Sequence, residues 1–259
     1  MLSLSLLLLQ VCIVTQTPQG RATSIVLADV GHTTSTATHT VLDREAAGYS
    51  QLWSAFSKRS CILRINREPF SAAMLTGISV LVATAIAADK PLAAGEVQTL
   101  RRFVESGGTL LLVNGDLEPS AVGMWKKLAG EFAVQSHGEV LRWITPQGPS
   151  THISRYSGAG LARWLRGLED AQLYCQGSTA GPTGGEVLIS YDGSALAAMQ
   201  PVGKGKVYVF GGDLLSNAYT AGKPQTAEHG ELPAANARLL DGLIDELLES
   251  AREPQRAKP

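Results

Sequence analysis

The sequence predicts an α/β protein with a doubly wound, mostly parallel sheet that gains antiparallel strands late in the chain. In the first half, apolar runs alternate with amphipathic segments, as strands alternate with crossover helices in a parallel sheet. In the second half, Asp192-Gly193 separates two apolar runs, which is a strong hairpin signal. A long amphipathic segment near the end of the chain then predicts a last helix against the sheet.

The first half predicts four strands and two helices. The third and fourth strand segments are apolar almost throughout, as expected when helices cover both faces. The second helix begins after Pro91 and ends at Gly107-Gly108, because helices favour glycine at this end. We expect strands at 24–29, 61–65, 78–84 and 109–114, and the first helix over 44–57.

The second half predicts strands at 138–145, 186–191, 194–199 and 206–210, a short helix over 160–168 and a last helix over 234–250. No linker divides the chain, so residues 23–250 are expected to form a single domain. Residues 251–259 are polar and are expected to fray.

The composition excludes some classes of partner. The net charge of −1 argues against a strongly basic nucleic-acid binder, so no nucleic-acid partner is expected. Hydrophobic residues make up 44% of the chain, which is enough for a sizeable core.

The first 22 residues predict a signal peptide. Residues 1–14 carry no charge, and their apolar run is shorter than the roughly 20 residues that span a bilayer. Gly20-Arg21-Ala22 places cleavage after Ala22, so we expect a secreted or periplasmic protein without a membrane span in the mature chain. The alternative is an uncleaved N-terminal membrane anchor, since no Lys or Arg stands near Met1.

The mature chain keeps two cysteines, Cys61 and Cys175. In an oxidising compartment they could form a disulfide, and the alternative is two buried thiols on separate strands. No Cys-x-x-Cys or His-x-x-x-His pair occurs, so no standard zinc site is present.

Several segments carry a resemblance to a known family. They are Asp29-Val-Gly-His32, Val80-Leu-Val-Ala83, the stretch from Glu96 to Leu112, the stretch from Gly203 to Asp213, and Asn236 at the start of the last helix. This order resembles the class I glutamine-amidotransferase-like superfamily, in particular a divergent, non-catalytic branch of bacterial exported proteins. Its relatives include trehalose-utilisation-like proteins and gliding-motility and intraflagellar-transport domains. The resemblance covers residues 24–248 and implies a flavodoxin-like fold.

The catalytic motif of that superfamily is missing. Its enzymes carry a cysteine on a Gly-x-Cys-x-Gly turn, whereas here the fourth strand leads into Asn114-Gly115-Asp116. Cys175 matches only half of that pattern and lies late in the chain. Gly-x-Ser-x-Gly and nucleotide-binding motifs are also absent, so we expect no catalytic residue and no cofactor.

Polar residues follow several predicted strands, at the edge where parallel sheets bind ligands. The candidate ligand-binding residues are Asp29, His32, His39, Thr84, Asn114, Asp116, Asp213, Ser216 and Asn217. Such residues also cap helices and form turns, and converging carboxylates and imidazoles can hold a divalent metal or act as acid and base.

These observations lead to two hypotheses. The first is an exported amidotransferase-like domain that lacks catalysis and binds a carbohydrate, peptide or protein. The alternative is a hydrolase or metal-dependent enzyme that uses a cluster at the strand ends, namely Asp29, His32, Asp116 and Asp213. That enzyme requires the cluster to face one crevice.

We expect the exported protein to begin at Thr23, because Ala22 ends the only plausible cleavage site. Intact-mass measurement of the purified protein checks this. Recovery of the full-length chain from the membrane fraction would instead support an anchor.

Overall fold

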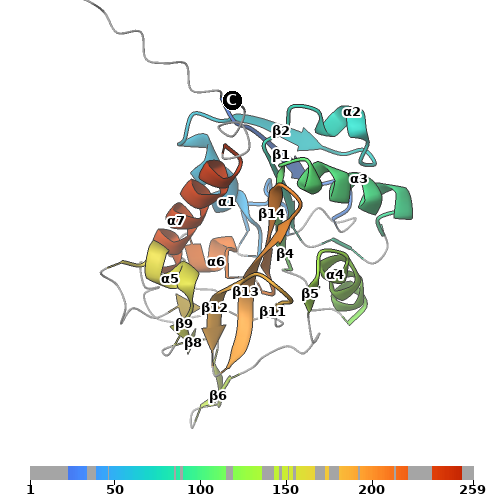
Figure 1. Ribbon diagram of the computed structural model, residues 1–259. Helices are drawn as coiled ribbons and strands as arrows, with labels where there is room; N and C mark the ends of the chain where they lie inside the picture. The colour runs from blue at the N-terminus through green and yellow to red at the C-terminus, as the bar shows by residue number, and fades with distance from the viewer. Residues whose placement is uncertain are drawn as a thin grey trace, which may run out of the picture.

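The computed structural model is an α/β fold around an eight-stranded sheet (Figure 1). It describes residues 23–33, 39–45, 47–84, 86–87, 90–114, 119–135, 143–145, 148–150, 152–153, 156–166, 173–174, 181–191, 193–212, 214–220 and 235–252. The predicted signal peptide, Asp116, Cys175, Asp213 and residues 253–259 lie outside the described residues.

The sheet has the order β2-β1-β3-β4-β14-β13-β12-β9. The five strands that run parallel to one another are β2 (Ile62–Asn66), β1 (Ile25–Asp29), β3 (Val80–Thr84), β4 (Thr109–Val113) and β14 (Gly205–Phe210). Antiparallel pairs then add β13 (Ser194–Val202), β12 (Glu186–Tyr191) and β9 (Tyr156–Ser157). The parallel part has the flavodoxin-like order, and its crossover direction reverses between β1 and β3.

Helices cover both faces of the sheet (Figure 1). One face packs against α1 (Ser50–Ser57), α5 (Ala159–Trp164) and α7 (Ala235–Ser250). The other face packs against α2 (Ala72–Leu75), α3 (Ala94–Glu105) and α4 (Pro119–Glu131). Within β3, Val80 and Val82 join the first core, whereas Leu81 joins the second. Burial on both faces explains why this strand is apolar throughout.

Short elements complete the described structure. Three small antiparallel pairs are β5 (Val134–Gln135) with β11 (Gly181–Pro182), β6 (Trp143–Thr145) with β7 (Gly148–Ser150), and β8 (His152–Ile153) with β10 (Leu173–Tyr174). A single-turn helix, α6 (Asn217–Thr220), follows β14. Every helix in the described part of the chain is too short or too polar to cross a bilayer.

The first predicted helix starts later than its sequence pattern indicates. The prediction of a helix over 44–57 is wrong in its first half, because α1 begins at Ser50. The Asp43 carboxylate accepts the backbone N–H groups of His39 and Glu45, which holds this stretch in a turn.

Cys61 lies just before β2 and is a free cysteine. Its thiol donates to the Arg59 carbonyl oxygen at 3.5 Å. Burial raises the pKa of this thiol, and the nearby Arg252 and Arg59 charges offset the rise only in part.

Gly205 is required where β14 passes the end of α3. A Cβ at this position would collide with the carbonyl oxygens of Gly108 and Val104. We therefore expect Gly205→Ala to lower the free energy of unfolding by about 1–3 kcal/mol, measured by urea denaturation. The matched control is Gly95→Ala in α3, where the added Cβ meets no atom within 4 Å. A Gly205→Ala protein as stable as the control would contradict the close packing.

Candidate functional site

The described candidate residues lie at the carboxyl ends of the parallel strands. Asp29 ends β1, Thr84 ends β3, and Asn114 directly follows β4. Ser216 and Asn217 follow β14. Asp116 and Asp213 lie outside the described residues, so the site is described without them.

Asp29 and His32 contact each other directly at the end of β1. The Asp29 Oδ2 atom lies 2.9 Å from His32 Nδ1. Both residues are buried, with 1% of Asp29 and 7% of His32 exposed. The tight turn between them needs Gly31, because a Cβ there would lie 2.8 Å from the Arg67 carbonyl group.

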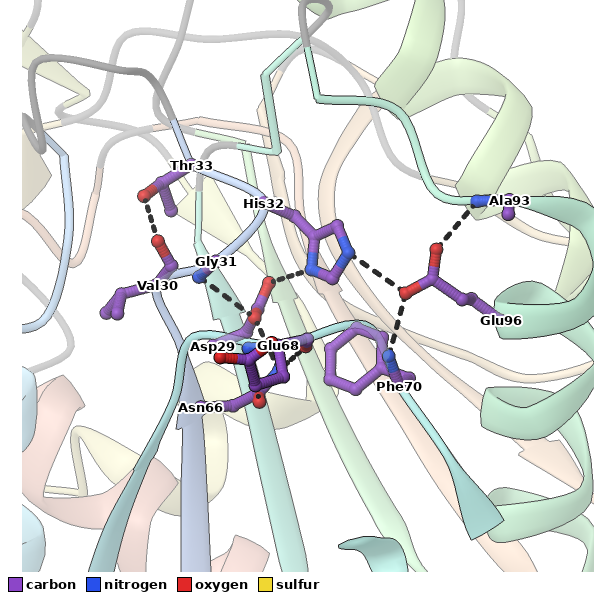
Figure 2. A network of polar contacts seen from close by, with 10 residues as sticks. All are labelled: Asp29, Val30, Gly31, His32, Thr33, Asn66, Glu68, Phe70, Ala93 and Glu96. Carbon is purple, nitrogen blue, oxygen red and sulfur yellow. Dashed lines mark hydrogen bonds and ion pairs between the residues drawn. The ribbon is translucent and has the colours of Figure 1, made fainter.

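A second carboxylate lies on the other side of the His32 ring. The Glu96 Oε1 atom is 3.0 Å from His32 Nε2, so the imidazole lies between two carboxylates (Figure 2). Ionised carboxylates only accept hydrogen bonds, so in the state in which both are ionised His32 is protonated and donates from both ring nitrogens. We call this group the Asp29–His32–Glu96 clamp.

Other groups hold the two carboxylates in place. Asp29 Oδ1 accepts the Gly31 N–H at 3.2 Å and the Asn66 side-chain N–H at 3.0 Å. Glu96 accepts the backbone N–H groups of Phe70 at 2.7 Å and Ala93 at 2.9 Å. The Phe70 ring also stacks on the His32 ring, with centroids 4.9 Å apart. The clamp thus joins the ends of β1 and β2 to the start of α3 (Figure 2).

The pKa values of the clamp agree with a charged pair. Burial alone would lower the pKa of His32, but the hydrogen bond and charge of Asp29, and then those of Glu96, raise it above 6.5. Burial would raise the pKa of Glu96, but the Ala93 and Phe70 N–H groups and the His32 charge lower it below 4.5. Each partner therefore favours the ionised form of the other.

Two further candidate residues, Asn217 and Thr84, use their side chains in hydrogen bonds within the protein. The Asn217 amide makes four hydrogen bonds, to Gln51 N, Ser50 Oγ and the carbonyl oxygens of Asp43 and Glu45. It therefore holds the loop before α1. The Thr84 hydroxyl donates to the His39 carbonyl oxygen at 2.9 Å, which ties the same loop to β3.

Two candidate atoms keep unused hydrogen-bonding capacity. His39 has a left-handed backbone, with a φ of 61°, and its buried Nδ1 atom has no hydrogen-bond partner among the described residues. Ser216 is fully buried, and within the same described ranges its Oγ atom also has no partner. Buried polar atoms without partners are uncommon and point to a missing contact. No group of three His, Cys, Asp or Glu residues within the described ranges is arranged to hold a metal ion.

Sequence reasoning did not include Glu96, Asn66 or Phe70 in the site. Glu96 occupies the third position of α3, where glutamate often accepts the N–H group that precedes the helix. Ala93 has no side-chain oxygen, so only that half of the usual capping pattern forms, and the sequence signal is correspondingly weak.

A family profile described as "Domain of unknown function (DUF4350)" matches residues 41–228. The chain belongs to the DUF4350 family. The DUF4350 match includes Asn66 and Glu96 but begins after Asp29 and His32. A search of curated proteins finds no match.

Solved structures share the fold of this DUF4350 chain. The mmIFT52 N-terminal domain is 17% identical, with a TM-score of 0.57, and the match covers 86% of this chain and 97% of that one. The cytoplasmic protein STM1381 from Salmonella typhimurium LT2 is 18% identical, with a TM-score of 0.56 and coverage of 86% and 99%. STM3548 from Salmonella typhimurium is 15% identical, with a TM-score of 0.51 and coverage of 86% and 98%. At such identities the likeness concerns the fold alone.

We expect His32→Gln to lower the free energy of unfolding by about 3 kcal/mol, because the buried Asp29 carboxylate loses its counter-charge. The loss should depend on pH. The raised His32 pKa stabilises the fold below pH 6.5, and this gain disappears as the pH rises through the folded pKa. The lowered Glu96 pKa stabilises the fold above pH 4.5, and that gain disappears as the pH falls through its folded pKa.

The difference between wild type and His32→Gln should therefore be largest between pH 4.5 and 6.5 and decline on either side, in urea denaturation series. Glu105→Gln is the control, since its pair with Arg101 is exposed and contributes little. A difference that stays constant from acid to alkaline pH would show that His32 acts by packing alone.

Proposed function

We propose that this chain is an exported, amidotransferase-like domain without catalysis, which binds or scaffolds a carbohydrate, peptide or protein. The clamp is the observation that carries this proposal. Both ring nitrogens of His32 and all four carboxylate oxygens of Asp29 and Glu96 already have protein partners. Groups bonded in this way hold loops in position, and a substrate would have to displace one of these partners to reach His32.

The sequence around the fourth strand supports the same proposal. Asn114 follows β4 where the superfamily enzymes that the sequence resembles carry a cysteine nucleophile. Its backbone N–H donates to Phe210 at 2.9 Å, so the end of β4 continues the ladder with β14. The sequence that follows, from Gly115 to Glu118, also carries no cysteine.

The loop before α1 and the segment after β14 offer ligand contacts. Asn217 and Thr84 fix this loop at the carboxyl edge, and His39 and Ser216 each bring to it a polar atom that has no partner in the described part of the chain. A hydroxyl or amide of a sugar or peptide would supply the partners that these atoms lack. Both atoms are buried, so we propose that they contact a ligand once the loop before α1 moves, with Asn217 and Thr84 as the residues that position this loop.

The metal-dependent alternative requires existing hydrogen bonds of the clamp to break. Asp29 and His32 would have to release each other before either could bind a cation, and the buried Asn66 bond would also break. That alternative therefore depends on Asp116 and Asp213.

Substitution of Ser216 tests the proposal. We expect Ser216→Ala to leave the melting temperature equal or slightly higher, because it removes a buried hydroxyl without a partner. The same change should weaken, by about tenfold, the binding of whichever mono- or disaccharide or short peptide stabilises the wild type in a thermal-shift panel.

Asn217→Ala is the matched control. It should lower the melting temperature clearly, because four hydrogen bonds to the loop disappear. A divalent ion that stabilises the protein, together with turnover of an ester, glycoside or peptide that is lost in Asp116→Asn, would replace the proposal with the metal-dependent enzyme.

A further inference from the structure

The opposite edge of the sheet holds a cavity of about 520 Å³. Its residues come from α2, from the last turns of α3 and from the segments that lead into β3 and β4, so it lies at the amino-terminal ends of these strands. Ala251, just after α7, also lines it. The volume falls within the range of pockets that hold small ligands.

Apolar side chains and one arginine line this cavity. Leu75, Ile78 and Phe103 give an apolar floor. Arg102 is the only charged residue among those described that line the cavity, and it forms no ion pair with a described acidic residue. Its neighbour Arg101 differs, because its guanidinium donates to Glu105 at 3.0 Å.

The hydroxyl groups in the lining do not compete for the arginine. Thr76 and Thr99 donate to the carbonyl oxygens of Ala72 and Gly95, at 3.0 and 2.8 Å. Ser106 donates to the Phe103 carbonyl at 2.9 Å. Their hydrogens are therefore committed to local backbone, and the Arg102 guanidinium is the lining side chain with donors to offer a ligand.

We infer that this cavity binds a small apolar carboxylate, with its carboxylate on Arg102 and its apolar body on Phe103, Leu75 and Ile78. A guanidinium matches a carboxylate with two parallel hydrogen bonds, and a lining with one cation and no acidic side chain is complementary to a single negative charge. The cavity lies at the edge of the sheet away from His39 and Ser216, so this inference does not depend on the proposed function.

Titration calorimetry with phenylacetate and its neutral amide, phenylacetamide, tests the inference on the full chain. The wild type should bind phenylacetate about tenfold more tightly than phenylacetamide, as expected for a hydrogen-bonded charge pair. Arg102→Gln should remove this preference. Arg101→Gln, on the same helix but outside the lining, should keep it.

A second variant tests the place of binding. Ala72 is exposed at the rim, so Ala72→Phe should fold normally while filling the cavity, and it should weaken both ligands equally. The dipeptide Gly-Phe and its amidated form distinguish the source of the carboxylate. Tighter binding of Gly-Phe than of phenylacetate would show that the cavity prefers the carboxylate of a peptide C-terminus. Weaker binding of Gly-Phe would show that it prefers a small free acid.

Three results would overturn the inference. They are the absence of saturable phenylacetate binding, equal affinity of the wild type for the acid and the amide, and an acid preference that survives in Arg102→Gln. Unchanged circular dichroism of each variant ensures that a loss of binding reflects the cavity.

Discussion

The contact of the His32 imidazole with two carboxylates ties the carboxyl ends of β1 and β2 to the start of α3. Two carboxylates from distant parts of the chain, Asp29 and Glu96, meet at this ring and would repel each other without it. The ring joins β1 to α3 across the point where the crossover direction reverses. The loops there are held by this polar network, whereas the two cores beneath them are apolar.

The sequence predicts the central sheet well because its signal is local. A strand such as Thr109–Val113 is buried on both faces, and continuous apolar character reports that burial directly. The first helix begins at Ser50, later than predicted, because the Asp43 carboxylate accepts two backbone N–H groups and holds a turn before it. The spacing of apolar residues in the sequence carries no information about such a bond. The helix α4 was not predicted, since Gly123 and Gly130 weaken its helical pattern.

The candidate site was predictable only in part, for a related reason. Asp29 and His32 are three residues apart, so their contact follows from a short turn. Glu96 reaches the same ring from the first turn of α3, 64 residues further along the chain, and only the folded topology brings it there. The sequence shows that Asn217 and Ser216 both follow a strand, but it does not show which of them is hydrogen-bonded. In the described part of the chain, the Asn217 amide bonds on both its oxygen and its nitrogen, whereas the Ser216 hydroxyl has no partner.

The pairing of β4 with β14 has a consequence for how the chain reaches this structure. Leu111 lies opposite Tyr208, so the middle of the sheet closes only after nearly the whole chain is available. The last helix, α7, which shares one face of the sheet with α1 and α5, comes later still. Contacts between distant segments slow folding, because the loop between them must close first. We therefore expect the sheet and its two cores to be completed late in folding, after the last segment of the chain is available.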